Sequence, residues 1–184
     1  MRTITMGKYK LPGTSKPNNI KIFMGWEWIV IKEGGGKALL LSRNIIDWEM
    51  YHGENCLFER AKPTTWEKCN LRGWMNDYYE KGFTEEEKAK ILTNELGDHL
   101  FLLTAEEADK YLRTNEYRVA EMIMADEWED YTEVFREKPC WWLNTPGADD
   151  CMQQVMDDHG EILEDGIDND ADEIGVRPAM WVKW

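Results

Sequence analysis

The chain has 184 residues, ten of them tryptophan, and a net charge of −14 from 36 acidic and 22 basic side chains. The negative field repels phosphate, so nucleic-acid binding is not expected. No apolar run approaches the roughly 20 residues that span a bilayer, so membrane insertion is not expected either. This length supports a substantial core, and we interpret residues 1–184 as one domain, with an N-terminal strand and loop over residues 1–19.

The N-terminal part of the chain predicts an antiparallel hairpin. Residues 20–23 and 27–32 look extended, three consecutive glycines at 34–36 indicate a turn, and residues 37–42 continue as an apolar strand. The near-continuous apolar run in this second strand indicates burial on both faces. The following segment, residues 43–63, is predicted to be irregular.

Two main helices are predicted in the middle of the chain. The first covers about residues 65–81, where four apolar side chains fall on one stripe. These are Leu71, Trp74, Met75 and Tyr78. The second begins at Thr84, which forms a capping-box pattern with Glu87, and ends near Leu92. The same pattern recurs at Thr104.

The double tryptophan Trp141-Trp142 predicts a strand with protein on both sides, because adjacent strand residues point to opposite faces. We expect it to pair in one sheet with the final apolar segment, residues 175–182. Residues 100–103 and 152–156 are also predicted strands. Both tryptophans are therefore assigned structural roles.

Two further segments give weaker patterns. Residues 114–131 are ambiguous between helix and loop, although Val119, Met122 and Ile123 fit a helix. The acidic stretch from Asp157 to Glu173 is predicted to be an irregular excursion between late strands. Four widely spaced cysteines without a C-x-x-C pair favour buried thiols over a zinc site.

The ordered motifs resemble a known family. WWLNTPG at residues 141–147 and GVRPA at residues 175–179 are similar to those of an uncharacterised bacterial domain family with WWLRSPG and GVRPAL-type motifs. That family resembles a branch of the C-type-lectin-like fold, which includes the formylglycine-generating enzymes. Asn144 stands where the family tends to have arginine.

The resemblance covers roughly residues 20–183 and implies an α+β fold. Its expected features are two main helices packed on small antiparallel sheets, with the N- and C-terminal strands close together. It also implies that the region between late strands, residues 144–175, carries the binding surface.

Candidate ligand-binding residues lie in three predicted loops, at about 44–62, 125–137 and 144–174. Aromatic and polar side chains in such loops can stack on a sugar or anchor a protein. The candidates are Trp48, Tyr51, Trp128, Tyr131, Asn144, Asp149, Asp150 and Gln153. For each ring, burial in the core is the alternative interpretation.

Calcium is the cofactor that the sequence suggests. Asp168, Asp170 and Asp172 alternate like the first ligands of an EF-hand loop. The glycine after the third acid and the glutamate at the twelfth position are missing, so a solvated acidic loop is the alternative. Arg177 is predicted to be structural, because a guanidinium in an apolar strand needs a partner, here the acidic loop or the turn at Asn144.

These patterns favour a non-enzymatic domain that binds a protein or carbohydrate ligand through its loops. One alternative is a metal- or oxygen-dependent enzyme, related to the formylglycine-generating enzymes. Another is a structural subunit of a phage or cell-surface assembly. Met1 to Lys10 lacks the apolar core of a signal peptide, so we expect a cytoplasmic or virion-associated protein, or the mature form of a secreted one.

Overall fold

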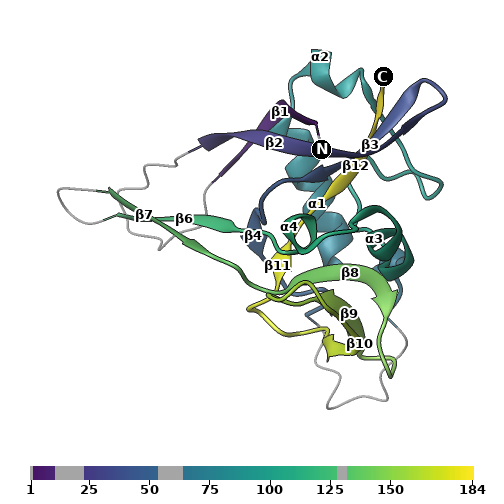
Figure 1. Cartoon of the computed structure of the whole chain (residues 1–184), viewed down its shortest axis with the longest axis vertical. Coiled ribbons are helices and arrows are strands. Elements are labelled where there is room, and N and C mark those ends of the chain that lie inside the picture. The colour runs from purple at the N-terminus through teal and green to yellow at the C-terminus, as the bar shows by residue number, and fades with distance from the viewer. Residues whose placement is uncertain (1, 11–22, 54–63, 128–131) are drawn as a thin grey trace.

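A computed structural model describes residues 2–10, 23–53, 64–127 and 132–184 (Figure 1). Over these ranges the protein is mostly β, with twelve strands and four short α-helices. The predicted α+β arrangement of the C-type-lectin-like fold, with two main helices on small sheets, is wrong. The first expected helix exists as α1 (Asn70–Gly82). The second ends after four residues as α2 (Glu85–Lys88), because the chain then enters a sheet.

The first five-stranded sheet contains both ends of the described chain. Its strands occur in the order β1, β2, β3, β12, β5. Their bounds are β1 (Thr3–Lys10), β2 (Phe23–Gly34), β3 (Lys37–Ser42), β12 (Ala179–Lys183) and β5 (Ile91–Leu92). The β2–β3 pairing confirms the predicted hairpin. Residues 91–92 leave the helical path because they pair with Val182 and Trp181 of β12.

The second five-stranded sheet has the order β10, β9, β8, β11, β4. Its strands are β10 (Ile162–Asp168), β9 (Met152–Met156), β8 (Trp141–Pro146), β11 (Gly175–Val176) and β4 (Asp47–Trp48). Gly175 pairs with Trp141 in parallel, which confirms that the double-tryptophan strand and the final segment share a sheet. The final segment is nevertheless two strands, since it changes sheets at Arg177-Pro178. The acidic excursion is also more regular than predicted, because β10 forms a hairpin with β9.

The remaining elements connect the two sheets. They are a 3-10 turn (Trp66–Lys68), α3 (Ala105–Tyr111), α4 (Asn115–Arg118) and the paired strands β6 (Met122–Glu127) and β7 (Thr132–Glu137). In Figure 1 the β6–β7 pair extends away from the sheets. Met122 and Ile123 lie in β6, so the helix predicted for these two residues is wrong. Residues 100–103 are buried but contribute only a single bridge, between Phe101 and Ala179. Among the described residues, no helix has both the length and the apolar character needed to cross a membrane.

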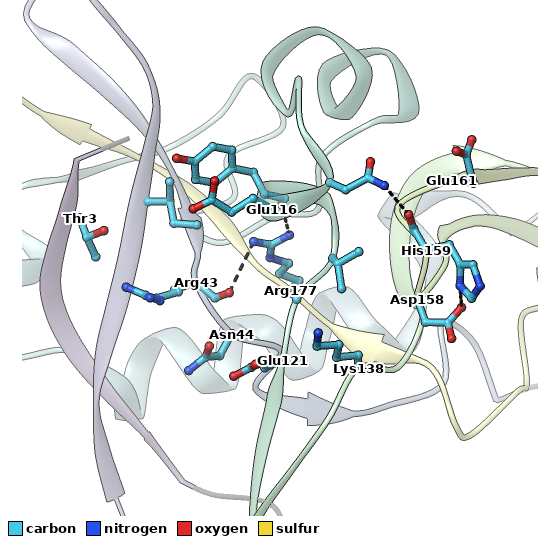
Figure 2. A pocket seen from close by; sticks show the side chains of 15 residues that line it. Thr3, Arg43, Asn44, Glu116, Glu121, Lys138, Asp158, His159, Glu161 and Arg177 are labelled. Atoms are coloured by element: carbon cyan, nitrogen blue, oxygen red, sulfur yellow. Dashed lines mark hydrogen bonds and ion pairs between the residues drawn. The ribbon is translucent and has the colours of Figure 1, made fainter.

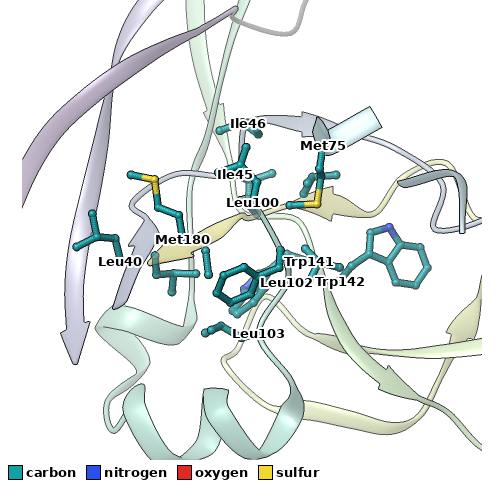
Figure 3. Packing of buried hydrophobic residues seen from close by; sticks show 14 of the residues in the cluster. Leu40, Ile45, Ile46, Met75, Leu100, Leu102, Leu103, Trp141, Trp142 and Met180 are labelled. Carbon is teal, nitrogen blue, oxygen red and sulfur yellow. The ribbon is translucent and has the colours of Figure 1, made fainter. Parts of the chain in front are cut away.

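One apolar cluster includes side chains from both five-stranded sheets and from α1 (Figure 3). Trp141 and Trp142 are both fully buried within it, as predicted. Their indole nitrogens are satisfied by backbone carbonyls, Trp141 by Arg118 at 2.9 Å and Trp142 by Glu49 at 2.8 Å. Each ring therefore buries a large apolar area without leaving its polar atom unpaired.

The stripe that α1 buries differs from the predicted one. Leu71, Met75 and Tyr79 are buried, whereas Trp74 and Tyr78 are only half-buried. The buried positions follow an i, i+4, i+8 row, so the contact face is rotated away from Trp74. This rotation leaves the Trp74 side chain facing a hollow in the surface.

Candidate binding site

A hollow of about 330 Å³, here called the aromatic pocket, lies between the exit of β4, the first half of α1 and the turn after β10. Two half-buried tryptophans, Trp48 and Trp74, contribute to its walls. The described residues that line it are Trp48, Glu49, Met50, Gly53, Asn70, Leu71, Trp74 and Asp172. Trp48 and Asp172 were candidates from the sequence; the other lining residues were not.

Backbone contacts hold the two walls of the aromatic pocket together. Trp48 pairs with Gly175 of β11, and the amide of Glu49 donates to the carbonyl of Ile174 at 3.3 Å. At the other end, the amide of Gly53 donates to Asn70 Oδ1 at 2.9 Å. Residues 48–53 are thus fastened to the second sheet and to the start of α1, and the pocket lies on a firm scaffold.

The aromatic pocket carries negative charge on an apolar surface. Among the described residues, its lining contains two acids, Glu49 and Asp172, and no basic side chain. Burial raises the pKa of Glu49, and a hydrogen bond from Trp74 partly opposes that rise. The Glu49 carboxyl is therefore held by the indole of Trp74 inside a half-buried site.

Most of the other candidates that the structure describes are engaged internally. Tyr51 is fully buried, packs edge-on against Trp142 at 5.8 Å between ring centroids, and donates to Asn144 Oδ1 at 3.2 Å. Gln153 is also buried and donates to the carbonyl of Leu143 at 3.2 Å. For Tyr51 the core alternative is favoured, and Asn144 and Gln153 take part in internal hydrogen bonds.

The remaining candidates are not brought into the aromatic pocket. Asp149 and Asp150 are exposed in the turn between β8 and β9, where Asp149 Oδ1 accepts from the amide of Cys151 at 2.9 Å. Trp128 and Tyr131 lie outside the described residues. Their ligand-binding roles remain predictions.

The predicted calcium ligands are not gathered into one group. Within the described ranges, the group of three possible ligands found together is Asp157, Asp158 and His159, not Asp168, Asp170 and Asp172. In that group Asp157 Oδ1 accepts from the amides of His159 and Glu161, at 2.9 and 2.7 Å. These contacts close the turn between β9 and β10, so the carboxylate of Asp157 stabilises that turn.

A second hollow, the polar cleft, is larger, at about 930 Å³ (Figure 2). Thr3 and Arg43 lie on one side, His159 and Glu161 on the other, and Arg177 between them. Charged side chains of both signs line it, including Arg43, Lys138, Glu116, Glu121 and Glu161. No sequence pattern predicts this cleft, because its walls come from segments that are far apart in the chain.

Several charged groups of the polar cleft already have partners. Glu121 pairs with Arg136 at 2.6 Å, and Asp158 Oδ1 lies 2.7 Å from His159 Nδ1. The hydrogen bond to Asp158 raises the pKa of His159. The cleft therefore has no uniform charge that would select an anion or a cation.

Arg177 is buried beneath the polar cleft and bonds backbone carbonyls rather than an acid. Its guanidinium donates to the carbonyls of Ser42 at 2.9 Å and Tyr117 at 2.7 Å, and lies 5.0 Å from the ring centroid of Trp141. Burial lowers its pKa to about 9. These partners differ from the acidic loop and the Asn144 turn that the sequence predicted for Arg177.

Burial disfavours the thiolate form of two described cysteines. It raises the pKa of Cys69 to about 11 and also raises the pKa of Cys140. Because the thiolate is the reactive form, both groups are less reactive than an exposed thiol. Cys69 and Cys140 are free cysteines, and Cys56 lies outside the described residues.

The fold and its hollows define a mostly β domain with an aromatic, acidic pocket and a separate mixed-charge cleft. The chain belongs to the DUF6273 family, described as a domain of unknown function, which it matches over residues 35–184. This agrees with the expected membership of an uncharacterised domain family. No curated protein and no solved structure matches the chain.

Proposed function

We propose that this domain is a non-enzymatic binding module that holds a group of a protein or carbohydrate ligand in the aromatic pocket. The observation that carries the proposal is the pair Trp48 and Trp74, two half-exposed rings around one hollow of about 330 Å³. Ligand sites are typically concave, mostly apolar, and roughly 300–1,000 Å³ in volume. Large rings at such a site supply contact area at low conformational cost.

The scaffold supports this function because the pocket wall is tied down on both sides. Residues 48–53 bond to β11 and its preceding residue and to Asn70 of α1. A preformed site loses less conformational entropy on binding than a loop that must fold around its ligand. The segment that follows β4 also lies within residues 44–62, one of the three loops that the sequence predicts to contact a ligand.

The enzyme alternative finds little support in two of the described thiols. A cysteine nucleophile must be deprotonated to react, and burial raises the pKa of both Cys69 and Cys140. The third alternative, a structural subunit of an assembly, requires contacts between copies or with other chains. Light scattering of the purified protein tests it.

The binding proposal predicts a loss of ligand capture when either pocket ring is removed. Wild-type protein, Trp48→Ala and Trp74→Ala are applied to an array of peptides and oligosaccharides. Trp184→Ala is the matched control, because Trp184 is 45% exposed and does not line the pocket. We expect wild type and the control to bind the same spots, and both pocket variants to lose them while keeping the wild-type circular dichroism spectrum. Equal binding by all four proteins would contradict the proposal.

A further inference from the structure

The carboxyl group of Glu49 is partly desolvated in the aromatic pocket, and no described residue offers a positive charge to offset this desolvation. It is half-buried in the aromatic pocket, and burial raises its pKa. Its hydrogen-bond partner is the indole of Trp74, which is neutral. Within the described ranges, no ion pair is formed by Glu49 or by Asp172, and the pocket lining contains no base. A desolvated carboxylate is stabilised when a cation approaches it.

We propose that the aromatic pocket binds a basic side chain, arginine or lysine, of a partner protein. This inference rests on the proposed function and deepens it by naming the chemistry of the occupant. Three features of the same pocket support it: a positioned carboxylate, tryptophan rings and an apolar wall.

The tryptophans and the carboxylates recognise different parts of such a side chain. Tryptophan is the aromatic ring that attracts cations most strongly, and arginine also stacks on it. Glu49, fixed by Trp74, offers an acceptor for charged N–H groups, and Asp172 adds a second negative charge at the exposed side. Leu71 and Met50 provide apolar surface for the aliphatic stem of the side chain.

The net charge of the whole chain also favours a basic partner. A net charge of −14 attracts a basic partner over long range and raises its association rate at low salt. A neutral sugar ring can stack on the same tryptophans, but it does not compensate the desolvated carboxylate of Glu49. The polar cleft lacks this selectivity because both signs of charge line it.

The probes are four blocked pentapeptides that differ only at the central residue: arginine, lysine, norleucine or glutamate. Binding to the full chain is followed by NMR through the indole N–H signals of Trp48 and Trp74, assigned with Trp→Phe variants. We expect the arginine and lysine peptides to shift these signals, and the norleucine and glutamate peptides to leave them in place. The affinity should fall as salt is added.

Glu49→Gln tests the positioned carboxylate, and Glu161→Gln is its matched control. Glu161 lies in the polar cleft, so its replacement removes the same charge from a different site. We expect Glu49→Gln to weaken binding of the arginine peptide by about tenfold or more, as for a charged hydrogen bond. Glu161→Gln should bind like wild type.

Two results would overturn the cation inference while leaving the binding module standing. One is an equal shift by the norleucine peptide, which would indicate an apolar site. The other is no shift by any peptide into the millimolar range while oligosaccharides are captured through Trp48 and Trp74. Equal array binding by wild type, Trp48→Ala and Trp74→Ala, tested separately, would instead remove the proposed function itself.

Discussion

Arg177 lies where the final segment passes from β11 in one sheet to β12 in the other. Its side chain reaches carbonyls of two other segments, at Ser42 and Tyr117. Buried carbonyls that lose their donor each cost free energy, because no water replaces it. A single guanidinium therefore satisfies the backbone at a junction where regular sheet pairing stops.

Replacing Arg177 with methionine should lower the free energy of unfolding by about 3 kcal/mol, since several carbonyls are left unpaired in the interior. Urea denaturation followed by tryptophan fluorescence measures this loss. Arg136→Met is the control: Arg136 is an exposed residue paired with Glu121, and an exposed pair contributes about 0–1 kcal/mol. Similar unfolding midpoints for the two variants would show that the Arg177 contacts contribute little.

Residues with local signals were easier to predict than residues whose environment comes from distant segments. The burial of Trp141 and Trp142 followed from strand alternation alone. The burial of Tyr51 did not, because it depends on Trp142 and Asn144, more than 90 positions later in the chain. Glu49 gave no signal either, since its partner Trp74 belongs to α1 and was assigned to the core.

At the scale of elements, the two capping boxes of α2 and α3 differ in one respect. Both are complete, with Thr84 and Thr104 as the caps, which confirms the sequence prediction. In α2 the box glutamate also makes a long-range contact: Glu87 Oε1 accepts from the amide of Gly7 at 2.7 Å. Glu87 therefore attaches α2 to β1 in addition to starting the helix.

We expect Glu87→Ala to be less stable than Glu107→Ala by about 1 kcal/mol, the value of one further hydrogen bond to a buried or half-buried amide. The matched variants share the loss of a capping box, so the difference between their free energies of unfolding isolates the Gly7 contact. Burial raises the pKa of Glu87, but hydrogen bonds from Gly7 and Thr84 outweigh it and leave the pKa lowered.

This lowered pKa sets the sign of the pH dependence. Because the folded-state pKa of Glu87 lies below its unfolded value, its stabilisation is present above the unfolded pKa and is lost as the pH falls through the folded pKa. The gap between wild type and Glu87→Ala should therefore be full at neutral pH and shrink in acid. A gap that persists unchanged in strong acid would contradict a role for the ionised carboxylate.

Secondary-structure elements were predicted well where the sequence pattern was local, and poorly where pairing with a distant strand determined the local structure. The β2–β3 hairpin, β9 and the caps followed from glycines, alternation and capping residues. The second helix was predicted too long because Ile91 and Leu92 pair with β12, a strand 90 residues later. Tertiary pairing outweighs helix propensity at such positions.

At the scale of the molecule, the last ten residues hold the two five-stranded sheets together. β11 pairs with β8 and β4, and β12 pairs with β3 and β5. The sequence indicated one pairing for this segment, but a change of sheet at Arg177-Pro178 has no signature in periodicity. The aromatic pocket depends on this junction, because Trp48 pairs with Gly175 on its outer edge.

Gly175 is the tightest point of the junction. A Cβ atom there would lie 2.6 Å from Ile45 Cγ2 and 3.1 Å from the carbonyl oxygen of Cys140. Because the first contact is with a fully buried residue and the second with backbone, neither neighbour is free to move away. The residue must be glycine for β11 to fit between β8 and β4.

Gly175→Ala should therefore destabilise the protein by about 1–3 kcal/mol, as overpacking of a filled interior does. Gly73→Ala is the matched control with the opposite expected sign, because a Cβ at Gly73 meets nothing within 4 Å and the residue lies inside α1. Alanine in a helix is favoured over glycine by about 1 kcal/mol, so this variant should be more stable than wild type. Urea denaturation of both variants measures the two changes, and if the sheets form one cooperative unit, Gly175→Ala shifts a single transition. A stable Gly175→Ala protein would mean that the two sheets are not held together at this point.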